Sequence, residues 1–235
     1  MKQIKLGMVN CYYLQSDQGN ILIDTGYAHD KALFLARLAK SGIAIDDIAY
    51  ILLTHHHDDH CGLVTSLLEH NPKIQLIMHP LCSSLTAKGC NTSEYGGAWC
   101  SRRMKMLMAL YKKFNVKRSS TYPPFSGREQ DILLDFSHGP VLFHGYTIIP
   151  TPGHTPDSIS LLDGRGNLFC GDASANFLHF AGTKYAPPII TDLQEFYETW
   201  KKLLDLPIQQ IYPGHGKSFA PDRLEHNLHA LKART

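Results

Sequence analysis

The most informative segment of this chain is Thr54-His55-His56-His57-Asp58-Asp59-His60. It directly follows residues 50–53, an apolar run that is typical of a short β-strand. The segment is too polar for a protein core, and it holds too many metal-ligating side chains for an ordinary turn. Alternate residues of an extended segment point the same way, so His55 and His57 can share one metal ion while His56 points away. Asp59 and His60 follow where the chain turns toward a helix, and they can face a second ion.

Three more ligand-type side chains occupy a similar position, at the end of an apolar strand and next to a glycine. His154 follows residues 146–149, Asp172 follows residues 168–170, and His215 follows residues 210–212. Imidazole nitrogens and carboxylate oxygens are suitable ligands for Zn²⁺ and similar divalent metals. A scaffold that brings these strand ends to one edge would gather seven metal ligands: His55, His57, Asp59, His60, His154, Asp172 and His215.

These seven residues divide sensibly between two divalent ions. One ion would take three nitrogens, from His55, His57 and His154. The other would take one oxygen and two nitrogens, from Asp59, His60 and His215, and the two oxygens of Asp172 could bridge both ions. We expect Zn²⁺, with Mn²⁺ or Fe²⁺ as alternatives. Such a pair lowers the pKa of a shared water and would supply hydroxide near neutral pH, with Asp59 steadying the nucleophile and then the leaving group.

Strands and helices are both expected along the whole chain. Two β-rich halves, each with helices, predict an α/β protein in which two sheets stack with helices outside them. A helix is expected to begin with Asp30 as its cap and to stop at Gly42, and another helix is expected over residues 192–204. Asp163-Gly164 predicts a hairpin turn. The expected strands are residues 4–9, 11–14, 21–23, 50–53, 74–78, 132–136, 141–143, 146–149, 158–162, 168–170 and 210–212.

Residues 81–126 differ in composition from the rest of the chain. They contain no strand-like run, and no acidic residue lies between Glu94 and Glu129. Apolar residues recur at helical spacing, which predicts an amphipathic helix; they are Cys100, Met104, Leu107, Tyr111 and Phe114. We interpret this segment as a helical insertion near the active site. Its aromatic and methionine side chains either line an apolar pocket or form a core beneath the insertion.

Composition limits the class of protein. The chain has 235 residues, of which 43% are hydrophobic and 19% charged, so it is neither disordered nor fibrous and suits a single domain over residues 1–235. A net charge of +2 does not suggest a nucleic-acid binder. No apolar run is long enough for a membrane span. The six cysteines form no C-x-x-C pair and no signal-peptide pattern opens the chain, so we expect free thiols and a cytoplasmic location.

The motif set resembles the metallo-β-lactamase superfamily of hydrolases. The matching segments are residues 54–60, Thr151-Pro152-Gly153-His154-Thr155, Gly171-Asp172, Pro213-Gly214-His215-Gly216, Val9-Asn10-Cys11-Tyr12 and Ile23-Asp24-Thr25-Gly26. The resemblance implies an αββα sandwich of two mixed β-sheets, with helices on the outer faces and the site at one edge. It implies the metal roles given above, and it favours Asp24 as a partner that orients a ligand histidine.

The resemblance also narrows the expected reaction. A bridging Asp172 is similar to the glyoxalase II and lactonase branches and unlike dedicated β-lactamases. Lactonases place a tyrosine where this chain has Ala175, and Tyr185 or Tyr95 could replace it. We expect a hydrolase that cleaves an ester, thioester or lactone bond of a small molecule. The alternatives are a phosphodiesterase or nuclease with the same metals, and a metal-dependent sensor without turnover. A homodimer is possible.

Overall fold

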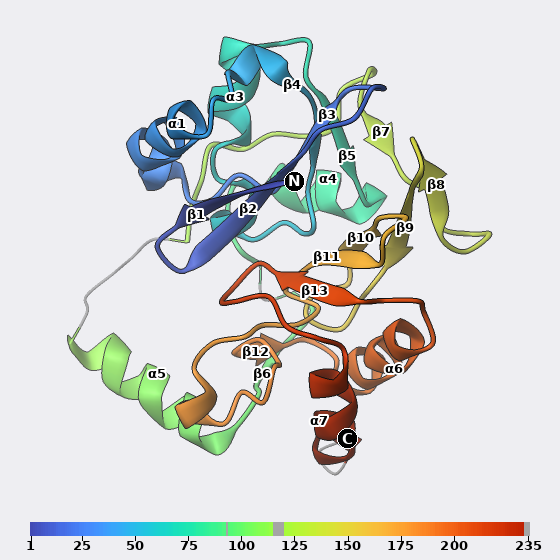
Figure 1. Cartoon of the computed structure of the whole chain (residues 1–235). Helices are drawn as coiled ribbons and strands as arrows, with labels where there is room; N and C mark the ends of the chain where they lie inside the picture. The colour runs from blue at the N-terminus through green and yellow to red at the C-terminus, as the bar shows by residue number, and fades with distance from the viewer. Residues whose placement is uncertain (93, 115–119, 233–235) are drawn as a thin grey trace.

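Two mixed β-sheets stack face to face, with helices on both outer faces (Figure 1). The computed structural model describes residues 1–92, 94–114 and 120–232. The predicted αββα sandwich is therefore confirmed. Figure 1 shows α1 and α3 on one side of the molecule and α6 and α7 on the other.

The first sheet has six strands in the order β1-β2-β3-β4-β5-β7. The first three strands pair antiparallel, and the pairs from β3 to β7 are parallel. Its strands are β1 (Lys2–Leu6), β2 (Val9–Leu14), β3 (Asn20–Ile23), β4 (Ile48–Leu52), β5 (Gln75–Met78) and β7 (Ile132–Leu133). The helices of this half are α1 (Lys31–Lys40), α2 (Asp58–Cys61), α3 (Val64–His70) and α4 (Pro80–Thr86).

The second sheet has five strands in the order β13-β11-β10-β9-β8, antiparallel except for the parallel pair β11 and β13. Its strands are β8 (Val141–Phe143), β9 (Tyr146–Pro150), β10 (Ile159–Leu162), β11 (Asn167–Gly171) and β13 (Gln210–Pro213). The predicted hairpin at Asp163-Gly164 is confirmed, since β10 and β11 pair antiparallel across it. The helices of this half are α6 (Leu193–Leu204) and α7 (Asp222–Lys232).

Alternating apolar side chains build three core layers. In β3, Ile21 and Ile23 lie in the layer between the sheets, whereas Leu22 packs among residues of the first helical layer. In β11, Phe169 faces the central layer, and Leu168 packs with residues from α6 in the third layer. Because successive strand residues point to opposite faces, a strand that is apolar throughout must be covered on both sides, and this requirement produces the four-layer order.

The chain departs from the predicted elements near its N-terminus. Residues 4–9 were expected to form one strand, but β1 ends at Leu6 and β2 begins at Val9. Gly7 takes a left-handed φ of 64°, which allows the tight turn that brings Met8 to the hairpin tip. Asp30 does precede α1, yet its side chain makes no capping hydrogen bond because a short 3₁₀ helix already occupies Ala28–Asp30.

The compositionally distinct segment contains more than helix. The predicted helix is present as α5 (Arg102–Phe114), and the side chains of Tyr111 and Phe114 lie outside the described residues. The expectation that the segment holds no strand is wrong, because β6 (Ala98–Trp99) pairs with β12 (Ile189–Ile190). Met104 and Tyr122 are buried in cores, whereas Met106 is exposed. None of the helices among the described residues combines the length and the apolar character that crossing a membrane requires.

Candidate metal centre

The loops that carry the predicted ligands meet at one edge of the two sheets. They follow the ends of β4, β9, β11 and β13. Backbone hydrogen bonds join these loops, since Ile159 N donates to Thr54 O at 2.8 Å and Gly214 N donates to Gly171 O at 2.7 Å. The site is therefore assembled by the sheets themselves, from residues that are up to 160 positions apart between His55 and His215.

Three imidazoles converge in a first group. His57 Nδ1 lies 3.1 Å from His55 Nε2 and 3.1 Å from His154 Nε2. His57 Nδ1 carries at most one proton, so it cannot donate a hydrogen bond to both His55 Nε2 and His154 Nε2. A single cation between the three nitrogens could accept a lone pair from each of them. The group is buried except at His57, which is partly exposed.

A second group combines one carboxylate with two imidazoles. His215 Nε2 lies 3.2 Å from Asp59 Oδ2, and His60 Nε2 lies 3.8 Å from Asp59 Oδ1. His60 and His215 are buried, and the Asp59 side chain is 15% exposed. The group therefore offers one oxygen and two nitrogens at a position that solvent reaches from the Asp59 side.

Asp172 lies between the two groups. Its Oδ2 is 3.5 Å from His154 Nε2 in the first group, and its Oδ1 is 3.4 Å from His215 Nε2 and 3.6 Å from His60 Nε2 in the second. Both Asp172 Oδ1 and His60 Nε2 are buried without a hydrogen-bond partner. Buried polar atoms rarely lack partners, so these two atoms fit a site in which a cation completes the contacts.

Four of the histidines are oriented by hydrogen bonds from their Nδ1 atoms. His55 Nδ1 lies 3.1 Å from Thr54 Oγ1, and His60 Nδ1 lies 2.7 Å from Asp24 Oδ2. Backbone carbonyls hold the other two: His154 donates to Ile189 O at 2.8 Å and His215 donates to Met8 O at 3.0 Å. Fixing the proton on Nδ1 leaves each Nε2 lone pair free toward the cluster, as a metal ligand requires.

Asp24 lies beside His60, one of the predicted ligands. It is buried and adopts a left-handed φ of 58°, which is unusual for a residue other than glycine. Besides contacting His60, it accepts hydrogen bonds from Thr54 N at 2.9 Å and from Thr54 Oγ1 at 2.8 Å. One carboxylate thus links the segment after β3 to both ends of the histidine-rich loop.

His56 turns away from the cluster, as its position in an extended segment predicts. Its Nδ1 lies 2.9 Å from Asp157 Oδ1, and both side chains are almost completely buried. The hydroxyl of Tyr122 donates to His56 O at 2.8 Å. This pair joins the loop after β4 to the loop that carries His154. Sequence analysis missed it, because a lone aspartate three residues after a ligand carries no distinctive signal.

The carboxylates create an environment that favours positive charge. Burial alone would lower the pKa of His60, but Asp59 and Asp24 outweigh it and raise that pKa to about 10. Burial would likewise lower the pKa of His215, yet Asp172 and Asp59 raise it to about 9. A divalent cation would supply the same charge that these protons supply.

The first group behaves in the opposite way. Burial, together with neighbouring imidazoles, lowers the pKa of His55 and of His57 well below the usual range. Burial also lowers the pKa of His154. These three imidazoles are therefore neutral at neutral pH, which is the protonation state that binds metals.

Two glycines make room for the cluster. A Cβ on Gly214 would lie 2.6 Å from His60 Cε1 and 3.0 Å from Asp172 Oδ1. A Cβ on Gly171 would collide with the Thr54 side chain. Gly214 and Gly171 directly precede the predicted ligands His215 and Asp172. Because they lack a Cβ, the backbone at each glycine can approach the side chains of neighbouring loops.

The tyrosines considered as replacements at the Ala175 position do not contact the cluster. The Tyr185 ring packs against Phe219 and His179, with ring centroids 4.6 and 4.7 Å apart. Tyr95 is 42% exposed, and Ala175 is buried. Phe177 instead lies beside a predicted ligand, since its ring stacks on His215 at 5.0 Å.

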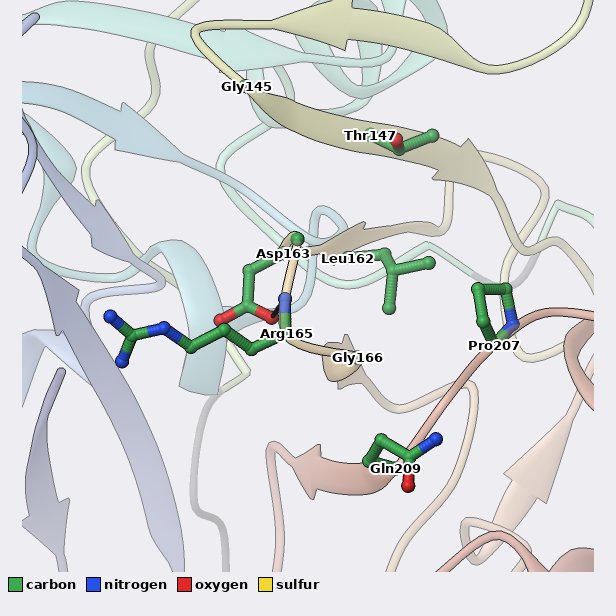
Figure 2. A pocket seen from close by; sticks show the side chains of 9 residues that line it. Gly145, Thr147, Leu162, Asp163, Arg165, Gly166, Pro207 and Gln209 are labelled. Atoms are coloured by element: carbon green, nitrogen blue, oxygen red, sulfur yellow. Dashed lines mark hydrogen bonds between the residues drawn. The ribbon is translucent and has the colours of Figure 1, made fainter.

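A separate pocket of about 400 Å³ lies at the other end of the same strands (Figure 2). Figure 2 shows Thr147, Asp163, Arg165, Pro207 and Gln209 around it. Thr147 is near the start of β9, whereas His154 follows its end, and Asp163 lies in the hairpin before β11, whereas Asp172 follows that strand. None of the seven predicted ligands lines this pocket, so it is not part of the metal centre.

Comparison with known proteins agrees with this architecture. The family model described as "Metallo-beta-lactamase superfamily" matches residues 4–215. The "Beta-lactamase-like protein 2 homolog" of Drosophila melanogaster is 27% identical over 88% of this chain and 58% of its own length. The "Probable metallo-hydrolase YqjP" of Bacillus subtilis is 24% identical over 87% of this chain and 66% of its own length. The chain thus spans less than two thirds of these relatives.

A solved structure of similar fold contains metal ions. The structure titled "Crystal structure of TTHA1623 in a di-iron-bound form" is 25% identical to the chain, with a TM-score of 0.61. The similarity covers 97% of this chain and 93% of that one. That protein, of nearly the same extent as this chain, is thus described in a di-iron-bound form.

Proposed function

Because the chain belongs to the metallo-beta-lactamase superfamily, most of whose members are metal-dependent hydrolases, we propose that it is a hydrolase with two metal ions. The bond that it cleaves is an ester, thioester or lactone of a small molecule. The observation that carries this proposal is the convergence of seven ligand-type side chains into two groups joined by Asp172. When bound, two divalent cations would activate a shared water and polarise the substrate carbonyl.

The predicted site residues would have different roles in this reaction. The first histidine group and the second mixed group would each hold one cation, and Asp172 would serve both groups. Asp59, the most exposed of the second group, is placed to steady the nucleophile and then the leaving group. Asp24 holds the proton on His60 Nδ1 and so orients that ring.

The donor set fits several first-row metals. Five imidazole nitrogens and two carboxylates suit Zn²⁺, and they also suit Mn²⁺ and Fe²⁺. We propose Zn²⁺ as the native metal. The di-iron form of a similar structure makes iron the first alternative to test.

We further propose that residues 1–235 act as one hydrolase domain, with a helical insertion at residues 81–126 near the active site. Two contacts support this placement: Asn91 Nδ2 donates to Asp58 Oδ1 at 2.8 Å, and Tyr122 donates to the carbonyl of His56. A cytoplasmic location, a homodimer and the lack of a nucleic-acid partner stay predictions.

A substrate panel tests the proposal. Metal-depleted protein is reloaded with Zn²⁺, Mn²⁺ or Fe²⁺ and assayed with p-nitrophenyl acetate, an acyl thioester, a lactone and bis-p-nitrophenyl phosphate. We expect carbonyl substrates to be cleaved and the phosphate diester to be left intact. Cleavage of the phosphate diester alone would make the protein a phosphodiesterase, and bound metal without any turnover would make it a sensor.

A matched pair of variants locates the activity. His57→Ala removes one nitrogen that lies 3.1 Å from two others, so we expect loss of metal and of hydrolysis. His70→Ala, at the exposed end of α3, serves as the control and should retain both. Hydrolysis that survives in the His57→Ala variant would contradict the proposal.

A further inference from the structure

Two of the predicted ligands are oriented by residues whose side chains are exposed and apolar. His215 donates to the carbonyl of Met8, and the Met8 side chain is 65% exposed at the tip of the β1–β2 turn. His154 donates to the carbonyl oxygen of Ile189. Ile189 lies in β12 and is 40% exposed. Because these carbonyls contact the ligand rings directly, both apolar residues lie at the border of the metal centre.

A third apolar side chain lies directly on a ligand. The ring of Phe177 stacks on the ring of His215, with centroids 5.0 Å apart and planes inclined by 25°. Phe177 is half-buried, so part of its ring stays open to solvent. Phe177 thus places an apolar surface directly against a predicted ligand.

The loop that carries Phe177 is held in an unusual conformation. Leu178, Lys184 and Tyr185 have left-handed φ values of 54°, 50° and 66°. Such strain persists only where neighbouring contacts fix the backbone. Here the buried Thr183 donates from Oγ1 to Phe177 O at 2.7 Å, and Ala175 N donates to Tyr185 O at 2.8 Å. The chain thus keeps a strained loop that places Phe177 beside His215.

The border extends along a short ribbon. Ile189 and Trp99 are paired residues of β12 and β6, so their side chains lie on the same face of that ribbon. Among the described residues, no lysine or arginine forms an ion pair with any of the seven predicted ligands. The exposed or half-buried side chains that adjoin the ligand rings at Met8, Phe177 and Ile189 are all apolar.

We propose that Met8, Phe177 and Ile189 form a subsite for the apolar acyl group of the substrate. This inference rests on the proposed hydrolase function and specifies its substrate class as esters or thioesters of medium-length aliphatic acids. Apolar side chains gathered beside a few polar groups are typical of small-molecule sites. The cluster positions the carbonyl, and the three side chains cover the chain that extends from it.

The first test is a chain-length series. Metal-loaded protein is assayed with p-nitrophenyl esters from acetate to decanoate. We expect kcat/KM to rise about two- to fourfold per added methylene group until the subsite is filled, with most of the change in KM. Phe177→Ser, Met8→Ser and Ile189→Ser should flatten this dependence, and Phe177→Leu should restore most of it. Leu142→Ser, at an exposed position of β8, is the control and should leave it unchanged.

The metal content of the serine variants shows whether these side chains contact substrate or only support the metal centre. Met8 and Ile189 hold the histidines through backbone carbonyls, so their serine variants should keep the wild-type metal content while losing the chain-length dependence. Loss of metal in both variants, or an unaltered chain-length dependence in all three serine variants, would overturn the assignment.

A binding measurement keeps this inference separate from the proposed reaction. Butanoate, hexanoate and octanoate are titrated calorimetrically into the metal-loaded protein. We expect affinity to increase with chain length in the wild type and in Leu142→Ser, and to increase much less in Phe177→Ser. Absence of ester cleavage with length-dependent alkanoate binding would reject the hydrolase and keep the subsite. Equal affinity for the three acids would reject the subsite even if esters are cleaved.

Discussion

Asp172 is the residue whose geometry bears most directly on the number of bound ions. Its two oxygens face different groups of ligands, at 3.4–3.6 Å from three imidazole nitrogens. Asp172→Ala should therefore reduce the metal content from two ions to about one per chain. Inductively coupled plasma mass spectrometry of purified protein measures this ratio. Asp205→Ala, at an exposed position after α6, is the control, and two ions retained in Asp172→Ala would contradict a bridging role.

The two ligand groups should respond differently to pH. The raised pKa values of His60, about 10, and His215, about 9, mean that both are protonated at neutral pH before a cation binds. Each proton must be displaced, so affinity at that group falls by up to about tenfold per pH unit and per proton on acidification. The first group has lowered pKa values and meets no such competition near neutrality.

We therefore expect one ion to leave before the other as pH falls from 8 to 6, and the ion held by Asp59, His60 and His215 to leave first. Metal content after dialysis at each pH measures the order. Cobalt substitution provides a check, since absorbance reports the ligands that remain. Simultaneous loss of both ions, or earlier loss from the three-histidine group, would contradict the expected order.

At this scale the side chains of the candidate site could be predicted, whereas the residues that orient them could not, apart from Asp24. His55, Asp172 and His215 stand out because polar ligand types follow apolar strands. The carbonyls of Met8 and Ile189 give no signal, because every residue has one and only the fold decides which one lies beside a ring nitrogen. Phe177 was missed because only the fold brings its ring onto that of His215.

Among the loops, the buried pair of His56 and Asp157 joins the loop after β4 to the loop that carries His154. Removing one partner leaves the other charged or polar group buried without compensation, which costs about 3 kcal/mol or more. His56→Ala and Asp157→Ala should each lower the free energy of unfolding by this amount and reduce metal retention. Burial would raise the pKa of Asp157, but the bond to His56 outweighs it and lowers that pKa.

Urea unfolding of both single variants and of the double variant measures this coupling. The double variant should lose less stability than the sum of the singles, by about 1 kcal/mol or more. His70→Ala is the control, because that side chain is exposed. Strictly additive losses would show that the pair does not act as a unit.

Elements were predicted best where the apolar pattern is long. The helix α6 was expected over residues 192–204 and begins at Leu193. Short elements were predicted less well. The strand β6 has two residues, too few to show any alternation, and it forms because it pairs with β12. The split between β1 and β2 depends on the φ of Gly7, and a glycine within an apolar run does not by itself mark a turn.

For the whole molecule, metal binding and folding should be strongly linked. The ligands come from loops of both sheets, between His55 and His215, so they are together only in the folded chain. A ligand that binds only the folded state at 100 times its Kd stabilises it by about 2.7 kcal/mol. For a chain of this size, chelation should lower Tm by roughly 5–10 °C.

Thermal unfolding by circular dichroism, with and without a chelator, measures this shift. Increasing Zn²⁺ should raise Tm progressively in the wild type. The His57→Ala variant should show a much smaller response, because one ligand group is incomplete. A wild-type Tm that is independent of both chelator and Zn²⁺ would contradict the linkage.

The architecture as a whole was accessible from sequence, and the substrate was not. Strands that are mostly apolar, such as β2 and β10, whose residues are all buried, require cover on both faces, which leads to stacked sheets between helices. Substrate preference depends on which exposed side chains border the cluster. That proposed border is formed by Met8, Phe177 and Ile189, of which Met8 lies far from the other two in the chain, and no local pattern brings them together.

The main-chain anchors at Met8 and Ile189 have an evolutionary consequence. A carbonyl oxygen survives any replacement of the side chain beside it, so mutation at either position can exchange one apolar group for another while the ligand histidine keeps its orientation. Lineages that carry this scaffold can thus explore new substrates by single substitutions, without passing through inactive intermediates that have lost their metals.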